Sequence, residues 1–256
     1  MNLELSGKRV LITGGSRGIG FSCAHAFLRE GCSVQLVATS AANLDKAVST
    51  LRGEGLEQVS GIVADLSRPE GVESVRPLAA GVDILVNNAG AIPGGGLDLV
   101  DAKRWRDSWE LKVFGYVDLT RMTLLPMMER GRGVIVNVVG IAGAAPRYDY
   151  LCGSTANAGL IAFTKAAGAH SSRKGVRVVG VNPGPTETDR LVQLYRTRAQ
   201  ASLGDPERWR ELLADLPFGR PARAEEMADI VVYLASARAS YLSGVVIDAD
   251  GGAMYR

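Results

Sequence analysis

Short runs of apolar residues alternate along the chain with longer segments in which apolar residues recur every three or four positions. The short runs are rich in Val, Ile and Leu without regular polar alternation, which is typical of strands buried on both faces. They predict strands at 8–13, 33–38, 59–64, 83–87, 133–138, 176–181 and 245–248. The longer segments predict helices at 18–29, 41–52, 69–78, 103–129, 152–171, 189–213 and 224–236.

Regular alternation of strand and helix predicts a parallel sheet with right-handed crossovers. We therefore expect an α/β protein: one doubly wound domain over 1–256, with a seven-stranded parallel sheet and helices on both faces. No repeat, low-complexity tract or linker divides the chain. Prolines at 183, 185, 217 and 221 bracket the segment 189–216, which we interpret as a substrate lid within the domain.

Composition narrows the classes of function. Of 256 residues, 46% are hydrophobic and 22% are charged, which is ordinary for a globular protein and excludes a disordered chain. Lys and Arg total 29 and Asp and Glu total 27, a net charge of +2. This balance gives no strong electrostatic field that would attract nucleic acid or anionic lipid. Aromatic residues, at 6%, are too few for a base-stacking surface. We expect neither a nucleic-acid partner nor a membrane partner.

Cysteine and histidine are scarce. Cys23, Cys32 and Cys152 do not form a disulfide framework and are expected to be reduced thiols, and with only two histidines no cluster has metal-ligand spacing. No metal is therefore expected. The first residues mix acid, base and glycine, unlike a signal peptide, and the uncharged stretch 133–146 is too short to span a bilayer. We predict a cytoplasmic protein.

A glycine-rich turn follows the first predicted strand, in the order Thr13-Gly14-Gly15-Ser16-Arg17-Gly18-Ile19-Gly20. Gly14 allows the sharp turn, Gly18 allows close approach of a pyrophosphate, and Gly20 lets the helix pack near the sheet. The helix that begins there presents free N–H groups to phosphate. Between a strand and a helix, this pattern predicts a dinucleotide-binding, Rossmann-type domain.

The spacing Gly-x3-Gly-x-Gly resembles the TGxxxGIG motif of the short-chain dehydrogenase/reductase family. The resemblance extends over almost the whole chain, and most closely to its β-ketoacyl-carrier-protein reductase-like branch. Further matching motifs are Asp65-Leu66, Asn87-Asn88-Ala89-Gly90, Asn182-Pro183-Gly184-Pro185 with Thr188, Phe218-Gly219-Arg220-Pro221, and Asp250-Gly251-Gly252. The resemblance implies hydride transfer between a nicotinamide and a small-molecule carbonyl or alcohol. It also implies a homo-oligomer, commonly a tetramer joined through the long helices and the last strand.

The resemblance and the glycine turn together give an expected cofactor site. Its residues are Gly14, Ser16, Arg17, Gly18, Ile19, Gly20, Thr39, Ser40, Asp65, Leu66, Asn87, Ala89, Gly90, Asn157, Pro183, Gly184, Thr186 and Thr188. An NAD enzyme places an acid at the end of the second strand, and this chain has Thr39 and Ser40 there. With Arg17 in the glycine turn, hydroxyls and a guanidinium suit the 2′-phosphate of NADP. The alternative is a solvated Arg17 and weakly bound NAD.

The family's catalytic tetrad is absent. Family members use Tyr, a Lys four residues later, a Ser and an Asn. The segment 156–165 matches the family helix and puts Gly153 at the place of the Tyr and Asn157 at the place of the Lys. Gly140 stands for the Ser and Lys112 for the Asn. Each loss removes acid–base catalysis or oxyanion stabilisation, so four losses are unexpected in an ordinary reductase.

Neighbouring residues offer substitutes. Tyr150 precedes Gly153 by three residues, about one helical turn, and we expect Gly140 and Gly153 to leave space into which it leans. Lys112 supplies an ammonium from the adjacent helix. Tyr150 and Lys112 are the candidate catalytic residues, and Asn157 is expected to donate to a ribose hydroxyl. The alternative is that Tyr150 packs at the helix start and Lys112 forms a salt bridge.

Two functions fit the sequence. The first is an NADP(H)-dependent oxidoreductase acting on a carbonyl or alcohol through a non-standard acid–base group. The second is an NADP-binding protein without hydride transfer, either a sensor or scaffold or an enzyme that reuses the pocket. Arginines 190, 196, 198, 208 and 210 of the lid would accept an anionic substrate, but the acids at 205, 207, 211 and 215 favour a solvated helical surface.

Overall fold

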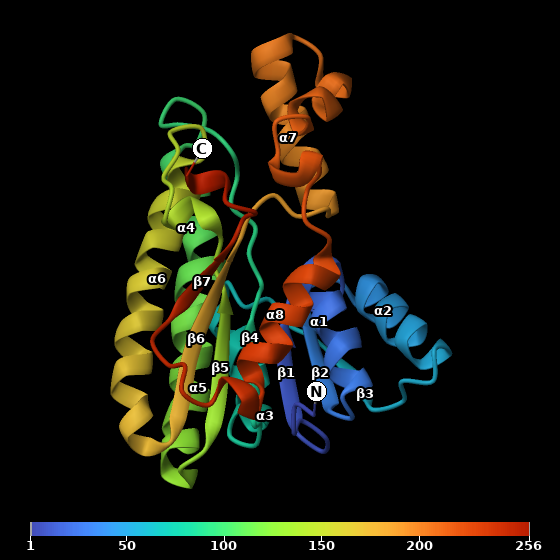
Figure 1. The fold of residues 1–256 in the computed structure, drawn as a ribbon, viewed down its shortest axis with the longest axis vertical. Coiled ribbons are helices and arrows are strands. Elements are labelled where there is room, and N and C mark those ends of the chain that lie inside the picture. Colours follow the sequence, from blue (N-terminus) through green and yellow to red (C-terminus); the bar gives the residue numbers. More distant parts are fainter. Residues whose placement is uncertain (1, 256) are drawn as a thin grey trace.

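The computed structural model describes residues 2–255 and is built around one parallel sheet (Figure 1). The strand order across this sheet is β3-β2-β1-β4-β5-β6-β7. The strands are β1 (Arg9–Thr13), β2 (Ser33–Ala38), β3 (Val59–Val63), β4 (Ile84–Asn87), β5 (Gly133–Val138), β6 (Val176–Pro183) and β7 (Val246–Ala249). The predicted doubly wound, Rossmann-type α/β fold is confirmed.

Helices cover both faces of the sheet. On one face lie α1 (Gly18–Arg29), α2 (Ala41–Gly53) and α8 (Ala224–Ala235). On the other lie α3 (Pro69–Ala79), α4 (Ala102–Trp109), α5 (Gly115–Arg130) and α6 (Leu151–Ser171). Within β1, Val10 and Ile12 join the core against α1 and α8, whereas Leu11 joins the core against α3 and α5. Because successive strand residues point to opposite faces, burial on both sides explains why the strands lack polar alternation.

Two helical segments differ from the sequence prediction. The predicted helix 103–129 consists of α4 and α5 joined by a π-helical turn at Glu110–Phe114. The predicted helix 189–213 is broken: α7 (Asp189–Leu203) ends at Gly204, whose φ of 73° is left-handed, and a 3₁₀ segment follows at Pro206–Leu213. Apolar spacing alone specifies neither the π-helical turn nor the left-handed glycine that ends α7.

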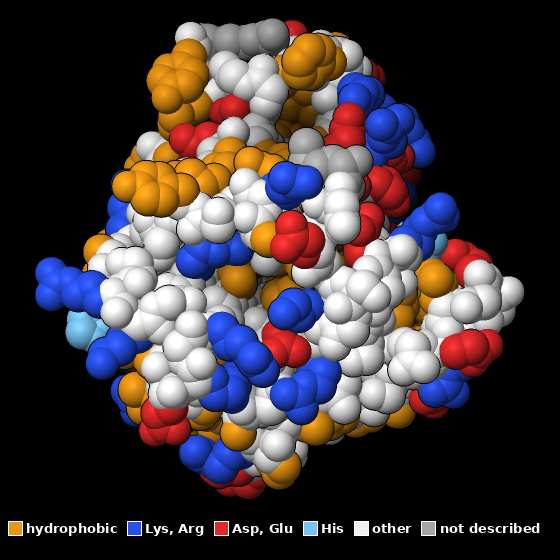
Figure 2. Space-filling model, turned by 60° about the horizontal axis from the view of Figure 1, so that its bottom comes forward, with side chains coloured by type: hydrophobic (Ala, Val, Ile, Leu, Met, Phe, Trp, Pro, Cys, Tyr) orange, Lys and Arg blue, Asp and Glu red, His pale blue; other side chains and the backbone are white. Residues whose placement is uncertain are grey.

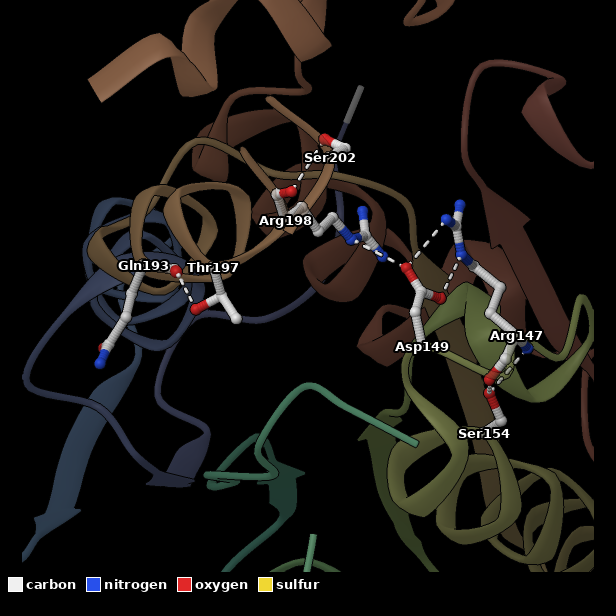
Figure 3. A network of polar contacts seen from close by, with 7 residues as sticks. All are labelled: Arg147, Asp149, Ser154, Gln193, Thr197, Arg198 and Ser202. Atoms are coloured by element: carbon white, nitrogen blue, oxygen red, sulfur yellow. Dashed lines mark hydrogen bonds and ion pairs between the residues drawn. The ribbon is translucent and has the colours of Figure 1, made fainter. Parts of the chain in front are cut away.

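The segment after β6 stands beyond the carboxyl ends of the strands, as the orange α7 region of Figure 1 shows. Leu191, Tyr195, Ala199 and Trp209 give it a small core of its own. It is also tied to the loop before α6, because Nε of Arg198 lies 3.2 Å from Oδ2 of Asp149 (Figure 3).

Charges are mixed over the surface. Figure 2 turns the bottom of Figure 1 forward and shows Lys and Arg side chains with Asp and Glu among them. This agrees with the near-balanced composition. Among residues 2–255, no helix has the length and apolar character needed to cross a bilayer.

Arg177 of β6 supports the end of α8. Its guanidinium donates to the carbonyls of Leu234 at 2.7 Å, Ala235 at 3.2 Å and Ser236 at 2.9 Å. These carbonyls belong to the last turn of a helix, where no N–H of the helix can reach them. We expect Arg177→Met to lower the free energy of unfolding by ~2 kcal/mol, measured by urea denaturation. Exposed Arg173 is the control, and an equal loss from Arg173→Met would contradict this role.

Candidate active site

The glycine turn between β1 and α1 has a backbone that side chains would obstruct. Gly14 and Gly18 have φ of 64° and 52°, in the left-handed region that favours glycine. A Cβ on Gly20 would overlap the carbonyl oxygen of Gly14 and lie 2.6 Å from Nδ2 of Asn88. No side chain caps the N-terminus of α1, so its first N–H groups remain open to a ligand. This cradle fits a dinucleotide pyrophosphate.

Asn88 fixes the turn to the end of β4. Its Nδ2 donates to the carbonyls of Thr13 at 3.0 Å and Gly14 at 3.2 Å, while the Thr13 hydroxyl accepts from the N–H groups of Asn88 and Ala89. Asn88 was not among the residues expected at the cofactor site. The Asn-Asn-Ala-Gly motif was the available signal, but the sequence does not tell which asparagine faces the glycine turn.

The loop after β6 borders the glycine turn, and together they form the candidate cofactor crevice. Cγ2 of Thr188 would lie 2.9 Å from a Cβ on Gly18, so this loop rests against the glycine turn. Thr188 also caps α7 by accepting from the N–H of Leu191. Pro183 and Gly184 lie at the end of β6, and Gly184 donates to the carbonyl of Ala249. The crevice therefore lies at the carboxyl ends of β1 and β4, where the strand order reverses, as in other doubly wound sheets.

Several expected cofactor residues have side chains committed elsewhere. Asn87 is fully buried and donates to Asn137 and Thr120 inside the sheet, so its amide does not face the crevice. Leu66 belongs to the core against α3 and α5. The hydroxyl of Ser40 accepts from the N–H of Asn43 and caps α2. The side chains of these three residues stabilise the elements that border the crevice.

Other expected residues are accessible. Thr39 and Arg17 are exposed, and Nη1 of Arg17 lies 3.8 Å from Oδ2 of Asp189, a loose ion pair that leaves the guanidinium free to move. Hydrogen bonds from Ser67, followed by the nearby Arg68, hold the pKa of Asp65 below its usual value, against the opposing effect of burial. Asp65 thus remains an anionic acceptor at the end of β3.

Tyr150 occupies the space above Gly153. A Cβ built on Gly153 would overlap Cε1 and Cζ of the Tyr150 ring. Tyr150 is the residue that precedes α6, and its ring packs against a cluster that includes Ile92, Cys152 and Ala156. A phenol ring therefore lies over Gly153, where the resemblance predicts the family tyrosine, and it is carried by a residue three positions earlier.

The space beside Gly140 is filled as well. Gly140 has φ of 134°, and Nδ2 of Asn157 would lie 2.8 Å from a Cβ placed there. Nδ2 also lies 3.4 Å from the Gly140 carbonyl, to which it donates, and Oδ1 is buried without a partner among the described residues. The Tyr150 ring leans into the space beside Gly153, whereas Asn157, and not Tyr150, fills the place beside Gly140. The Asn157 side chain is turned to Gly140, rather than being free for a ribose.

Lys112 lies at the centre of the π-helical turn, and such turns are frequent at functional sites. It is buried, with Nζ 2.8 Å from the hydroxyl of Tyr116 and 2.8 Å from the Val138 carbonyl. Burial, and secondly the charge of Arg190, lowers its pKa to about 7. Lys112 was expected to supply an ammonium from the adjacent helix, and the structure bonds that ammonium to Tyr116 and Val138.

The low pKa of Lys112 predicts a pH-dependent stability. Above about pH 7 the folded chain releases a proton that the unfolded chain still holds. The free energy of unfolding therefore rises with pH by up to ~1.4 kcal/mol per unit, and it levels off below pH ~7, where both states are protonated. Lys112→Met removes this contribution, whereas Lys165→Met, at an exposed position of α6, leaves it. Urea denaturation between about pH 6 and pH 9 measures it, and parallel curves for wild type and Lys112→Met would contradict the assignment.

Arg190, one of the five arginines of the segment 189–216, contacts the candidate site. Its Nη2 donates to the Tyr150 hydroxyl at 2.9 Å and to the Ile92 carbonyl at 2.8 Å, and its Nη1 donates to the Gly90 carbonyl at 3.3 Å. The lid arginines at 196, 198, 208 and 210 instead meet Glu207, Asp149, Glu211 and Trp209. The solvated-surface interpretation thus does not extend to Arg190.

Known proteins are similar to this chain in both sequence and fold. A family model described as short chain dehydrogenase matches residues 8–199. The 3-oxoacyl-[acyl-carrier-protein] reductases of Vibrio cholerae and Escherichia coli are 36% and 35% identical over 259 residues, covering 98% of each chain. L-sorbose reductase from Gluconobacter frateurii, complexed with NADPH and L-sorbose, has a TM-score of 0.89 at 32% identity over 100% of both chains. Actinorhodin polyketide ketoreductase with NADPH has a TM-score of 0.90 at 28% identity over 98% of both chains.

The family match over residues 8–199 spans most of the chain and holds strands β1 to β6, the glycine turn and the Asn88 contacts. Relatives above 30% identity cover nearly the full length of the chain. The chain therefore belongs to the short-chain dehydrogenase/reductase family.

Proposed function

We propose that the chain is an NADP(H)-dependent oxidoreductase acting on a carbonyl or alcohol, with Tyr150 as its proton donor and acceptor. The cofactor is NADP, in keeping with the NADPH present in the related L-sorbose reductase and actinorhodin ketoreductase structures. When bound, NADPH supplies the hydride. The glycine turn and the open N-terminus of α1 hold its phosphates.

The observation that carries the proposal is the placement of the Tyr150 ring over Gly153. It puts a phenol where the family needs one, although the residue at the matching position is glycine. Nη2 of Arg190 donates to the Tyr150 oxygen, which leaves the phenolic hydrogen free to be donated to a substrate oxygen. Both contacts support Tyr150 as the proton donor and acceptor.

Lys112 has a supporting role in the proposal. Its buried ammonium lies beneath Gly90, since a Cβ on that glycine would be 2.8 Å from Cδ and 3.5 Å from Nζ of Lys112. The positive charge stabilises the negative charge that develops on a substrate oxygen above it. Because its pKa is near 7, this stabilisation weakens as the pH rises above neutrality.

A second candidate function is NADP binding without hydride transfer. The observation in its favour is Gly140, whose backbone excludes the family's serine and whose neighbour Asn157 fills the space. No hydroxyl at that position would then stabilise a substrate oxygen. Tetramer assembly and a cytoplasmic location likewise stay predictions.

Two measurements on the same protein separate the candidates. NADPH fluorescence titration tests binding, and we expect saturation although the family lysine is missing. NADPH oxidation against ketones, aldehydes, oxo acids and β-keto thioesters tests hydride transfer. Binding with measurable turnover supports the oxidoreductase. Binding without turnover on any class supports the second candidate, and no binding at millimolar cofactor contradicts both.

A further inference from the structure

The charge of Arg190 has no acidic partner in the protein. Within residues 2–255, no carboxylate oxygen lies within 4.0 Å of its guanidinium; the carboxylate of the preceding residue, Asp189, lies instead 3.8 Å from Arg17. The acceptors of Arg190 are two backbone carbonyls and a phenol, all neutral. Three of its five N–H groups are used in these bonds, so two remain for a ligand.

A second cation stands on the other side of the same loop. Lys112 lies beneath Gly90, and the carbonyl of Gly90 accepts from Arg190. The hydrogen-bond acceptors of Lys112 are also neutral, namely Tyr116 and the Val138 carbonyl. Two cations therefore flank one loop of the candidate site with no carboxylate bonded to either. Arg190 is exposed and therefore accessible to a ligand, whereas Lys112 is buried, and a buried cation is stabilised by a nearby anion.

We propose that Arg190 binds a carboxylate of the substrate, so that the substrate is a 2-oxo acid and the product the corresponding 2-hydroxy acid. This inference rests on the proposed oxidoreductase function and names its substrate class. The 2.9 Å hydrogen bond from Nη2 of Arg190 to the Tyr150 oxygen holds the guanidinium beside the proposed proton donor, and its free N–H groups are on Nε and Nη1. The carbonyl oxygen meets Tyr150 while the adjacent carboxylate meets the free N–H groups of Arg190.

The reaction balances with these groups. The carbonyl carbon gains the hydride from NADPH, the C=O π bond breaks, and the oxygen takes the Tyr150 proton. The tyrosinate regains a proton from solvent, and NADP⁺ and the 2-hydroxy acid leave. Arg190 holds the carboxylate through the reaction and fixes which face of the carbonyl is presented.

The test compares charged and neutral members of one series. Straight-chain 2-oxo acids from three to eight carbons are assayed beside their methyl esters, by NADPH oxidation and by calorimetric binding to the protein with NADP⁺. We expect roughly 10- to 100-fold preference for the acids in kcat/KM and in affinity. Arg190→Met removes the preference and Arg190→Lys restores part of it. Arg196→Met, on an exposed arginine of the same helix paired with Glu207, leaves it unchanged.

The outcomes distinguish the two proposals. Turnover of the esters and other neutral carbonyls without a preference for any acid overturns the carboxylate site and leaves the oxidoreductase intact. Arg190-dependent binding of the acids without turnover leaves the carboxylate site and overturns the oxidoreductase. Arg190→Met would instead show that Arg190 serves the cofactor if it weakens NADPH binding and lowers kcat/KM equally for acids and esters. That result overturns the carboxylate site.

Discussion

Replacing Tyr150 with Phe lowers kcat for the best carbonyl substrate by roughly 10²- to 10⁴-fold, the usual contribution of a positioned general acid. The change removes one oxygen and keeps the ring that packs over Gly153 and against Ile92 and Cys152, so the fold is retained. NADPH affinity, measured by fluorescence titration, stays unchanged. The measurement is steady-state NADPH oxidation with purified wild type and variant.

Gly153→Ala is a second way to test the same assignment. Its methyl group would overlap the Tyr150 ring and displace the phenol without altering it chemically. We expect kcat to fall in this variant too. Gly159→Ala is the matched control, because a Cβ on this glycine of the same helix meets nothing within 4 Å. Brisk turnover in Tyr150→Phe would show that the proton comes from elsewhere.

Replacing Arg17 with Ala weakens NADPH binding roughly 10- to 100-fold and leaves NADH nearly unchanged. The reason is the loss of charge-assisted hydrogen bonds to the 2′-phosphate, worth ~1.5–3 kcal/mol. Arg17 is exposed in the glycine turn, and its ion pair with Asp189 is long, so its removal costs little stability. Calorimetric titration of both cofactors measures the difference.

The control for Arg17 is Arg29→Ala, at the exposed far end of α1. It changes the net charge equally and leaves both affinities unchanged. Equal weakening of NADPH and NADH in Arg17→Ala would assign Arg17 to the pyrophosphate instead of the 2′-phosphate. NADH binding as tight as NADPH binding in the wild type would overturn the expected cofactor preference.

Restoring the family tetrad is not a simple reversal. Ser at Gly140 requires φ of 134° from a residue with a side chain and would crowd Asn157. Tyr at Gly153 would need the space that the Tyr150 ring holds. Asn157 and Tyr150 already fill the space beside Gly140 and Gly153. Restoring Ser, Tyr, Lys and Asn at the four predicted tetrad positions therefore requires a change at Tyr150 as well.

The sequence by itself determined the sheet, the order of strands and helices and the glycine turn. These follow from local pattern: apolar runs bury strands on both faces, and glycines at 14, 18 and 20 permit a backbone that other residues do not. The resemblance to the family also predicted four substituted catalytic positions with Tyr150 as the neighbouring phenol, and these stay predictions. The motif spacing sufficed because each motif lies within a few residues of one strand end.

Only the tertiary structure decided what these side chains meet. Tyr150 and Arg190 are 40 residues apart in the chain, and Arg190 and Gly90 are 100 apart, so no local pattern pairs them. The turn that aims Lys112 at Val138 is π-helical, a backbone change that apolar spacing alone does not specify. Which of Asn87 and Asn88 faces the glycine turn depends on how β4 packs between β1 and β5. Long-range packing selects these partners, and the chemistry of the site follows from them.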